Sequence, residues 1–217
     1  MINLSKTYKY FAIFALMAFP FYSQAQFRKY SNEFLNIGAG ARGLAMGSAQ
    51  AASTKDGTAG YWNPAGLINV RTNTQVNLMH SEYFAGIGKY DFANVTIPTA
   101  NQKNVLGVTA LRFAVDDIPN TLFLVEPDGS INYNNISTFS SADYGFLLSY
   151  ARKLKSAENK NVNFGINAKV IHRGVGSFAK AWGFGIDAGL QIQKRKWQFG
   201  IVGKDITTTF NTWAFNF

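Results

Sequence analysis

Apolar and polar residues alternate one by one along three long stretches of the chain. In the clearest of them, 161–170, Val, Phe, Ile and Ala alternate with Asn, Gly and Lys, and the same period covers 141–150 and 182–193. Successive side chains of a β-strand point to opposite faces of its sheet, whereas an amphipathic helix repeats about every 3.6 residues. The alternation therefore predicts three β-strands, each with one apolar face and one face of polar residues and glycine.

Weaker forms of the same pattern predict five further strands, at 72–84, 89–98, 104–115, 196–206 and 209–217. The segment 116–138 is predicted to be one long loop because it contains Pro119 and Pro127-Asp128-Gly129. Strands of about 10–13 residues are longer than usual, but they match the roughly 9–11 residues that cross a bilayer at a tilt. Short turns at one rim and a long loop at the other are typical of up-and-down membrane barrels.

The polar faces help to choose between a membrane barrel and an exported β-sandwich. In a sandwich the face turned to water is usually charged or rich in Thr, whereas here it carries mainly Gly, Asn, Ser and Gln. Aromatic residues gather near the predicted strand ends, as membrane-interface girdles require. These residues are Tyr83, Phe84, Tyr90, Tyr150, Trp182 and Trp197. We therefore interpret the chain as an all-β protein, an antiparallel transmembrane β-barrel, with the β-sandwich as the alternative.

Residues 1–25 have the pattern of a secretory signal peptide. Lys6 and Lys9 precede an apolar run at 11–19, and Ser23-Gln24-Ala25 offers a small-x-small cleavage pattern. The apolar run is much shorter than the about 20 residues that a spanning helix needs. We therefore expect residues 1–25 to direct export, and the mature protein to reside in the cell outer membrane.

Charge and composition exclude several kinds of site. The chain has a formal net charge of +9, no Cys and 2 His. Without cysteine it cannot form disulfides, thiolate metal sites or Cys nucleophiles, and its sequence holds no zinc-site spacing, phosphate loop or hydrolase motif. Lys and Arg are spread along the sequence, which argues against nucleic acid as a partner. We expect a non-enzymatic protein without a metal or cofactor.

The segment 26–70 is rich in small residues and precedes the predicted barrel at 71–217. Gly38, Gly40 and Gly43 formally match the dinucleotide-binding pattern G-x-G-x-x-G, but no parallel βαβ unit is predicted around them. Glycine and alanine instead allow a short helix to pack closely. We interpret residues 26–70 as a hatch, or plug, that fills the interior of the barrel.

Other residues of the hatch are candidates for holding it in place. Trp62, Asn63 and Pro64 form a fixed turn before the first predicted strand. Two charged residues, Arg42 and Asp56, lie among the small ones. Arg42 is expected to pair with an interior carboxylate such as Asp143 or Asp187, mainly in a structural role and alternatively in gating.

One stretch of the hatch resembles a known family. Phe34–Leu67 contains Ala41-Arg42, Met46-Gly47, Asp56 and Tyr61-Trp62-Asn63-Pro64, and it resembles the opening of the PorV/PorQ family. The PorV/PorQ proteins are outer-membrane barrels of the type IX secretion system of Bacteroidetes and are related to the FadL fatty-acid transporters. The stretch 204–215 also resembles this family.

The resemblance implies a FadL-like barrel of about fourteen strands, of which about eight are covered here. The barrel at 71–217 is therefore expected to be incomplete at its C-terminal end, and a closed minimal barrel of about eight strands is the alternative.

By this resemblance the function is that of an outer-membrane component of type IX protein secretion and sorting. The implied partners are outer-membrane lipid, subunits of the translocon and of the attachment complex, and the C-terminal signal of secreted cargo. The long loop is expected to face the outside and to present Tyr133 or Phe139 to such a partner. Two alternatives stay open. One is a FadL-like channel that takes up hydrophobic small molecules through an apolar pocket between hatch and wall; the other is a purely structural barrel.

Overall fold

The computed structural model describes residues 32–70, 73–99, 103–157, 160–207 and 209–215. The expected signal peptide, residues 1–25, lies outside the described residues. The chain divides into two compact units, Met1–Glu33 and Phe34–Phe217, and the fold described below is that of the second.

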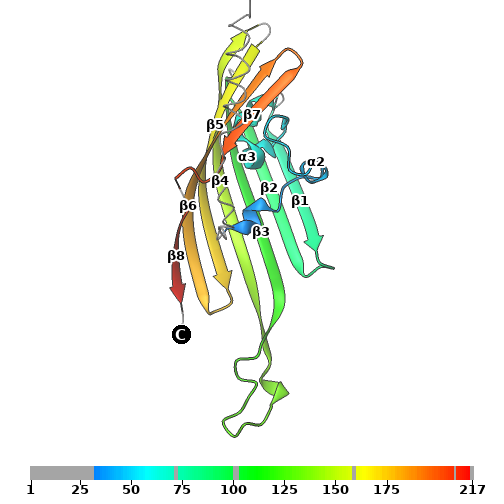
Figure 1. The fold of residues 1–217 in the computed structure, drawn as a ribbon, viewed down its shortest axis with the longest axis vertical. Helices are drawn as coiled ribbons and strands as arrows, with labels where there is room; N and C mark the ends of the chain where they lie inside the picture. The colour runs from blue at the N-terminus through cyan, green and yellow to red at the C-terminus, as the bar shows by residue number, and fades with distance from the viewer. Residues whose placement is uncertain (1–31, 71–72, 100–102, 158–159, 208, 216–217) are drawn as a thin grey trace, which may run out of the picture. The chain divides into compact units, whose positions relative to one another are not determined.

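Antiparallel strands form one curled sheet with the form of a half-barrel (Figure 1). From β1 to β7 each strand pairs with the next along the chain, so the sheet is an up-and-down meander. The strands are β1 (Gln75–Tyr83), β2 (Gly88–Pro98), β3 (Asn104–Asn120), β4 (Ser137–Ala157), β5 (Lys160–Val175), β6 (Ala179–Lys194), β7 (Trp197–Gly203) and β8 (Phe210–Phe215). The all-β prediction is confirmed. The described residues form no second sheet packed against this one, so the β-sandwich alternative is wrong.

The last two strands share one edge of the sheet. β7 pairs with Ala188–Lys194 of β6, and β8 pairs with Ala179–Phe184 of the same strand. Between them the ladder is interrupted at Lys204–Thr207, where the Ile206 N–H donates to the Ile186 carbonyl at 2.9 Å. The 8-stranded sheet is therefore seven positions wide, because β7 and β8 follow one another along a single line.

The long loop is shorter than the sequence predicts. β3 continues to Asn120 and β4 begins at Ser137, so the connection covers residues 121–136. A β-bulge between Val115 and Ile118 absorbs one of the two aspartates, with Asp117 at a φ of 57°, and the ladder resumes beyond it. Pro119 does not end β3 because β2 pairs with β3 only as far as Val115, so Pro119 lies at an edge of the sheet, where proline is tolerated.

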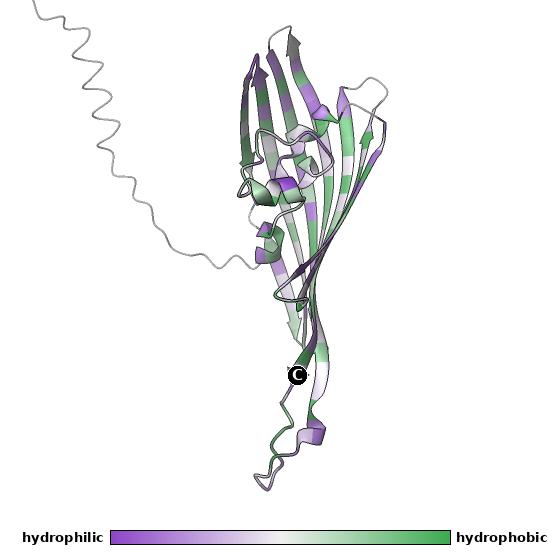
Figure 2. Cartoon of the chain, turned by 90° about the vertical axis from the view of Figure 1, so that its right-hand side faces the viewer, coloured by the Kyte–Doolittle hydropathy of each residue, from purple (hydrophilic) through white to green (hydrophobic). Residues whose placement is uncertain are grey.

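The two faces of the sheet have opposite character, and the apolar face is the exposed one. The alternation appears as stripes along the strands (Figure 2). On β6 the exposed side chains are apolar, among them Trp182 (51%), Phe184 (58%) and Ile186 (39%), whereas Asp187 and Gln191 on the other face are buried. Soluble antiparallel sheets have the reverse arrangement, with the apolar face covered.

Short helices of the hatch lie inside the curl of the sheet (Figure 2). They are η1 (Glu33–Asn36), α2 (Ala41–Ala45), α3 (Ala59–Trp62) and η2 (Pro64–Asn69), and a further turn of helix, η3 (Tyr133–Asn135), belongs to the long loop. None of the helices in the described ranges is long and apolar enough to cross a membrane. The concave face of the sheet is thus covered by the polypeptide that precedes it.

Candidate functional site: the hatch on the concave face

Asn63 is the central residue of the contact between the hatch and the sheet. It is fully buried, and its side-chain oxygen accepts from the Ala65 N–H at 3.1 Å, which caps η2 at its N-terminus. Its amide nitrogen donates to the Ala51 carbonyl at 2.7 Å and to the Leu190 carbonyl of β6 at 3.3 Å. Pro64 follows at the first position of η2, where its missing N–H costs nothing.

Glycines on the concave face allow the hatch to approach the strands directly. A Cβ at Gly165 of β5 would collide with the backbone of Pro64 and Ala65, and a Cβ at Gly189 of β6 would collide with the Asn63 side chain. Gly200 of β7 similarly faces the backbone of the hatch at Ala51. The glycines of the polar face therefore form the seat of the hatch, a role that the alternating pattern does not reveal.

The first half of the hatch packs around two aromatic residues. A Cβ at Gly43 would lie only 2.6 Å from the Trp62 ring. The Trp62 Nε1–H donates to the Ala39 carbonyl at 2.9 Å. Tyr61 donates to the Leu35 carbonyl at 2.6 Å and accepts from the Gly38 N–H at 2.9 Å. Burial raises the pKa of the Tyr61 hydroxyl, so Tyr61 stays a neutral donor.

This arrangement explains the glycine-rich pattern of the hatch without a nucleotide. Gly38 and Gly40 have positive φ angles of 106° and 82°, which favour glycine. Position 43 has no room for a side chain because the Trp62 ring occupies the adjacent space, so only glycine fits there. No βαβ unit surrounds these glycines in the described part of the chain.

Polar side chains of the strands bind the backbone of the hatch. Asn167 of β5 donates to the Gly60 carbonyl at 2.8 Å, and Gln191 of β6 donates to the Ala51 carbonyl at 3.0 Å. Gln191 also accepts from Asn69 at 2.9 Å. These hydrogen bonds explain why the buried face carries asparagine and glutamine rather than leucine, because buried backbone groups need partners.

A buried ion cluster lies beside the hatch. The Lys169 Nζ is 2.7 Å from Asp187 Oδ1 and 2.6 Å from Asp205 Oδ1, with Lys169 and Asp187 almost completely buried. Asp205 belongs to the interruption between β7 and β8, and its N–H donates to Asp187 at 2.9 Å. The adjacent Lys204 lies over the Tyr61 ring at 4.7 Å from its centroid. The cluster therefore links the strand interruption both to the sheet and to the hatch.

The ion pair predicted from the sequence between Arg42 and Asp143 or Asp187 does not form. Arg42 is exposed in α2, and Asp56 is exposed in a turn where it accepts from the Thr58 N–H at 2.9 Å. The two interior carboxylates have other partners, because Asp187 pairs with Lys169 and Asp143 pairs with Arg173 at 2.8 Å. Those partners, Arg173 and Lys169, lie on the neighbouring strand β5. Predicting these ion pairs requires the strand register, which the sequence alone does not give.

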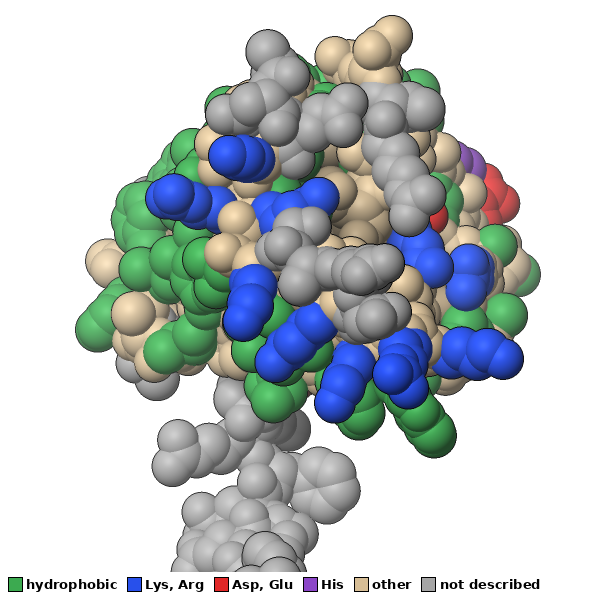
Figure 3. Space-filling model, turned by 90° about the horizontal axis from the view of Figure 1, so that it is seen from above, with side chains coloured by type: hydrophobic (Ala, Val, Ile, Leu, Met, Phe, Trp, Pro, Cys, Tyr) green, Lys and Arg blue, Asp and Glu red, His purple; other side chains and the backbone are tan. Residues whose placement is uncertain are grey.

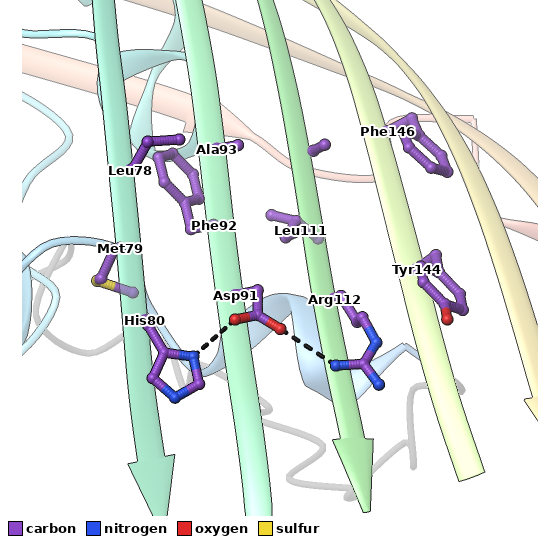
Figure 4. Close-up of a pocket in the computed structure, with 11 residues that line it drawn as sticks. Leu78, Met79, His80, Asp91, Phe92, Ala93, Leu111, Arg112, Tyr144 and Phe146 are labelled. Atoms are coloured by element: carbon purple, nitrogen blue, oxygen red, sulfur yellow. Dashed lines mark hydrogen bonds and ion pairs between the residues drawn. The ribbon is translucent and has the colours of Figure 1, made fainter. Parts of the chain in front are cut away.

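The convex face has a shallow depression that crosses β1 to β4 (Figure 4). It holds a row of polar residues in which the Asp91 carboxylate lies 2.7 Å from His80 Nδ1 and 3.2 Å from Arg112 Nη1. Tyr144 stands next to Arg112, with exposed Leu78 and Phe146 on the apolar side of the row. The row marks a level on the convex face at which polar side chains replace apolar ones.

The long loop is an ordered unit with exposed apolar side chains. The Glu126 carboxylate accepts from Asn132 at 3.0 Å and from Asn135 at 2.9 Å, and these bonds hold the pKa of Glu126 below its usual value. Tyr133 is 70% exposed. Phe139 differs from the expectation: it lies in β4, half-buried, with its ring 5.2 Å from that of Phe178, so it anchors the base of the loop.

The described residues include no cluster of three or more His, Asp or Glu side chains able to hold a metal ion. His172 and Asp187 lie on neighbouring strands but five register positions apart and on opposite faces: Asp187 is buried on the concave face, and the His172 ring packs against Trp182 on the other.

Fold and site together define a class: an all-β protein whose curled sheet is apolar outside and is covered inside by its own N-terminal segment. No protein-family model, curated protein or solved structure matches the chain.

Proposed function

We propose that the chain is an outer-membrane β-barrel protein and serves as a component of type IX protein secretion and sorting. The observation that carries the membrane part is the exposed apolar face of the sheet. From Trp182 to Ile192, the outward positions of β6 are all apolar, a run of about 34 Å at about 3.4 Å per residue. At a tilt of about 45° this run spans roughly 24 Å, close to the about 25 Å height of the apolar band of membrane β-barrels.

The hatch supports a plugged barrel rather than an open pore. Asn63 of the hatch donates a hydrogen bond to the backbone of the wall, and Asn167 and Gln191 of the wall donate to backbone carbonyls of the hatch. These polar side chains of the concave face therefore bind the hatch in place of water. The assignment to type IX secretion rests on the resemblance of Phe34–Leu67 to PorV/PorQ proteins. In this proposal the hatch residues that carry the resemblance have a structural role.

Cargo recognition is assigned to the long loop. Its exposed side chains include Leu122 (70%), Phe123 (71%), Val125 (62%) and Tyr133 (70%), an apolar surface that suits a protein partner. Val125 and Ile131 form a small antiparallel β-bridge, a short extended pair beside which a cargo signal would add a further β-strand.

The test is cargo secretion in cells that carry loop variants. Phe123→Ser with Tyr133→Ser is expected to reduce secretion of cargo while the protein remains in the membrane at normal levels. Asn134→Ser, a change at an exposed neighbour in the same turn, is the matched control and should leave secretion unchanged. Normal secretion by the double variant would remove the loop from the proposal.

The FadL-like channel remains the second candidate because an apolar cluster lies between hatch and wall. Tyr61 and Trp62 of the hatch meet Phe92, Leu111 and Ile171 of the sheet there. A channel for hydrophobic molecules would open this contact, and it predicts uptake of labelled fatty acid by cells that carry the protein. An export component should show no such uptake.

A further inference from the structure

Basic side chains gather at one end of the sheet, where the β4–β5 and β6–β7 connections meet (Figure 3). They come from positions that are far apart in the sequence, and each of them is exposed. We call this set the basic rim: Arg152, Lys155, Lys160, Lys194, Arg195 and Lys196. Lys and Arg are spread along the sequence, but the antiparallel connections bring these six together.

The rim is a local excess of positive charge among the described residues. In the described part of the chain, the ion pairs of Asp and Glu involve other residues than Arg152, Lys155, Lys160 and Lys194. Lys160 and Lys194 are direct cross-strand partners. Like charges directly opposite one another are destabilising, so the pair favours a bound anion.

The rim continues the apolar band of the convex face. Lys194 lies in the same outward column of β6 as Ile186 and Leu190, and Trp197 is its cross-strand partner on β7. At the opposite end of β6, beyond Trp182, lies Lys180, also exposed and outward. The rim thus occupies the level at which phosphate groups of lipids begin if the apolar band lies in a membrane.

We infer that the basic rim binds the phosphate groups of anionic lipids in the leaflet that it faces. The inference rests on the proposed membrane location. Lysine and arginine side chains reach from the edge of the apolar band toward the headgroups, and several of them neutralise the phosphates together. The occupant is a lipid rather than an acidic protein because the basic columns are continuous with the apolar ones and end at a tryptophan.

The test measures lipid preference of the full chain reconstituted into vesicles of phosphatidylcholine mixed with phosphatidylglycerol. After mild solubilisation, native mass spectrometry counts the lipids of each kind that remain bound. The native protein should retain phosphatidylglycerol preferentially. This preference should fall about fivefold in the single variant Lys194→Gln, and about fivefold again in the double variant that combines Lys160→Gln and Lys194→Gln. Added salt should weaken it.

The chain offers a closely matched control. Lys180→Gln removes the same charge from the same strand and the same face, at the other end, and should reduce the preference less than Lys194→Gln does, because its cross-strand partner is Gly174 and not a second lysine. Replacing Lys160 and Lys194 by Arg should preserve it. No preference in the native protein, or an equal loss in Lys180→Gln, would overturn the inference.

Other anions give distinct outcomes. If inorganic phosphate displaces phosphatidylglycerol at equal concentration, the rim binds free phosphate and not lipid. If the lysine variants lose binding to polyglutamate but keep their lipid preference, the rim fits an acidic polypeptide, and the inference is wrong. A chain that does not enter vesicles at all contradicts the proposed function, whereas one that enters without lipid preference contradicts only this inference.

Discussion

At Gly165 the backbone of the hatch comes so close to β5 that a side chain would collide with it. The residues involved on the hatch side are Pro64 and Ala65, whose backbone is held by the Asn63 cap and has no room to retreat. A methyl group at this position therefore has to displace the hatch rather than a flexible side chain.

Gly165→Ala is expected to destabilise the folded protein by about 1–3 kcal/mol, the usual cost of overpacking. Thermal unfolding in detergent measures the loss, and protease cleavage within residues 50–70 should become faster because the hatch is displaced. Gly174→Ala in the same strand is the control, since the nearest atom to its Cβ would be the Ala142 carbonyl oxygen at 3.9 Å. Equal stability of the two variants would contradict the role of Gly165 as a seat.

Lys169 is the second residue whose replacement has a definite expected effect. Lys169→Met leaves Asp187 and Asp205 without the cation between them, and uncompensated buried charge costs about 3–5 kcal/mol. Asp187→Asn keeps the Lys169–Asp205 pair and should cost less. Unfolding of both variants under the same conditions checks this order, and the reverse order would mean that Asp205 does not share the lysine.

At the scale of elements, the alternating pattern predicts the strands well because it follows from strand geometry alone. The predicted stretches 161–170 and 182–193 lie within β5 and β6, and the turn residues end most strands near their true limits. The pattern predicts the end of a strand less well where pairing with another strand determines that end. The bulge that extends β3 past Asp116-Asp117 exists because β4 offers partners as far as Ser137.

The site was predictable in part for the same reason. Trp62, Asn63 and Pro64 are recognisable as a fixed turn from residue type, but their contacts with β5 to β7 depend on strand register. Register also decides that Arg173 and Lys169, and not Arg42, neutralise the interior carboxylates. Glycine recurring on the polar face of neighbouring strands is the signal that could have located the seat of the hatch.

The long loop is an element with its own expected pH dependence. Hydrogen bonds to the ionised Glu126 carboxylate lower its pKa, so they stabilise the loop above the ordinary glutamate pKa. This stabilisation should be lost as the pH falls through the lowered pKa. The side-chain amide signals of Asn132 and Asn135 in NMR spectra report the change, and Glu126→Gln should remove the dependence. Signals that do not move with pH would show that the carboxylate does not order the loop.

At the scale of the whole molecule, the exposed apolar face is open to a direct chemical test because the chain has no Cys. Leu148→Cys places a thiol on the convex face, where Leu148 is 60% exposed, and Asn134→Cys places one in the long loop. In membranes, a water-soluble maleimide should label position 134 and leave position 148 unlabelled until the protein is denatured in detergent. Rapid labelling of both in native membranes would contradict a lipid-facing convex surface.

The single line shared by β7 and β8 has a consequence for how a cylinder could be completed. With seven strand lines in an alternating meander, β1 and the β7–β8 line run in the same direction. If these two edges joined, they would form the one parallel ladder in an otherwise antiparallel wall. A uniform closure therefore requires an odd number of additional lines, whatever their source, since only then does each neighbour oppose the next.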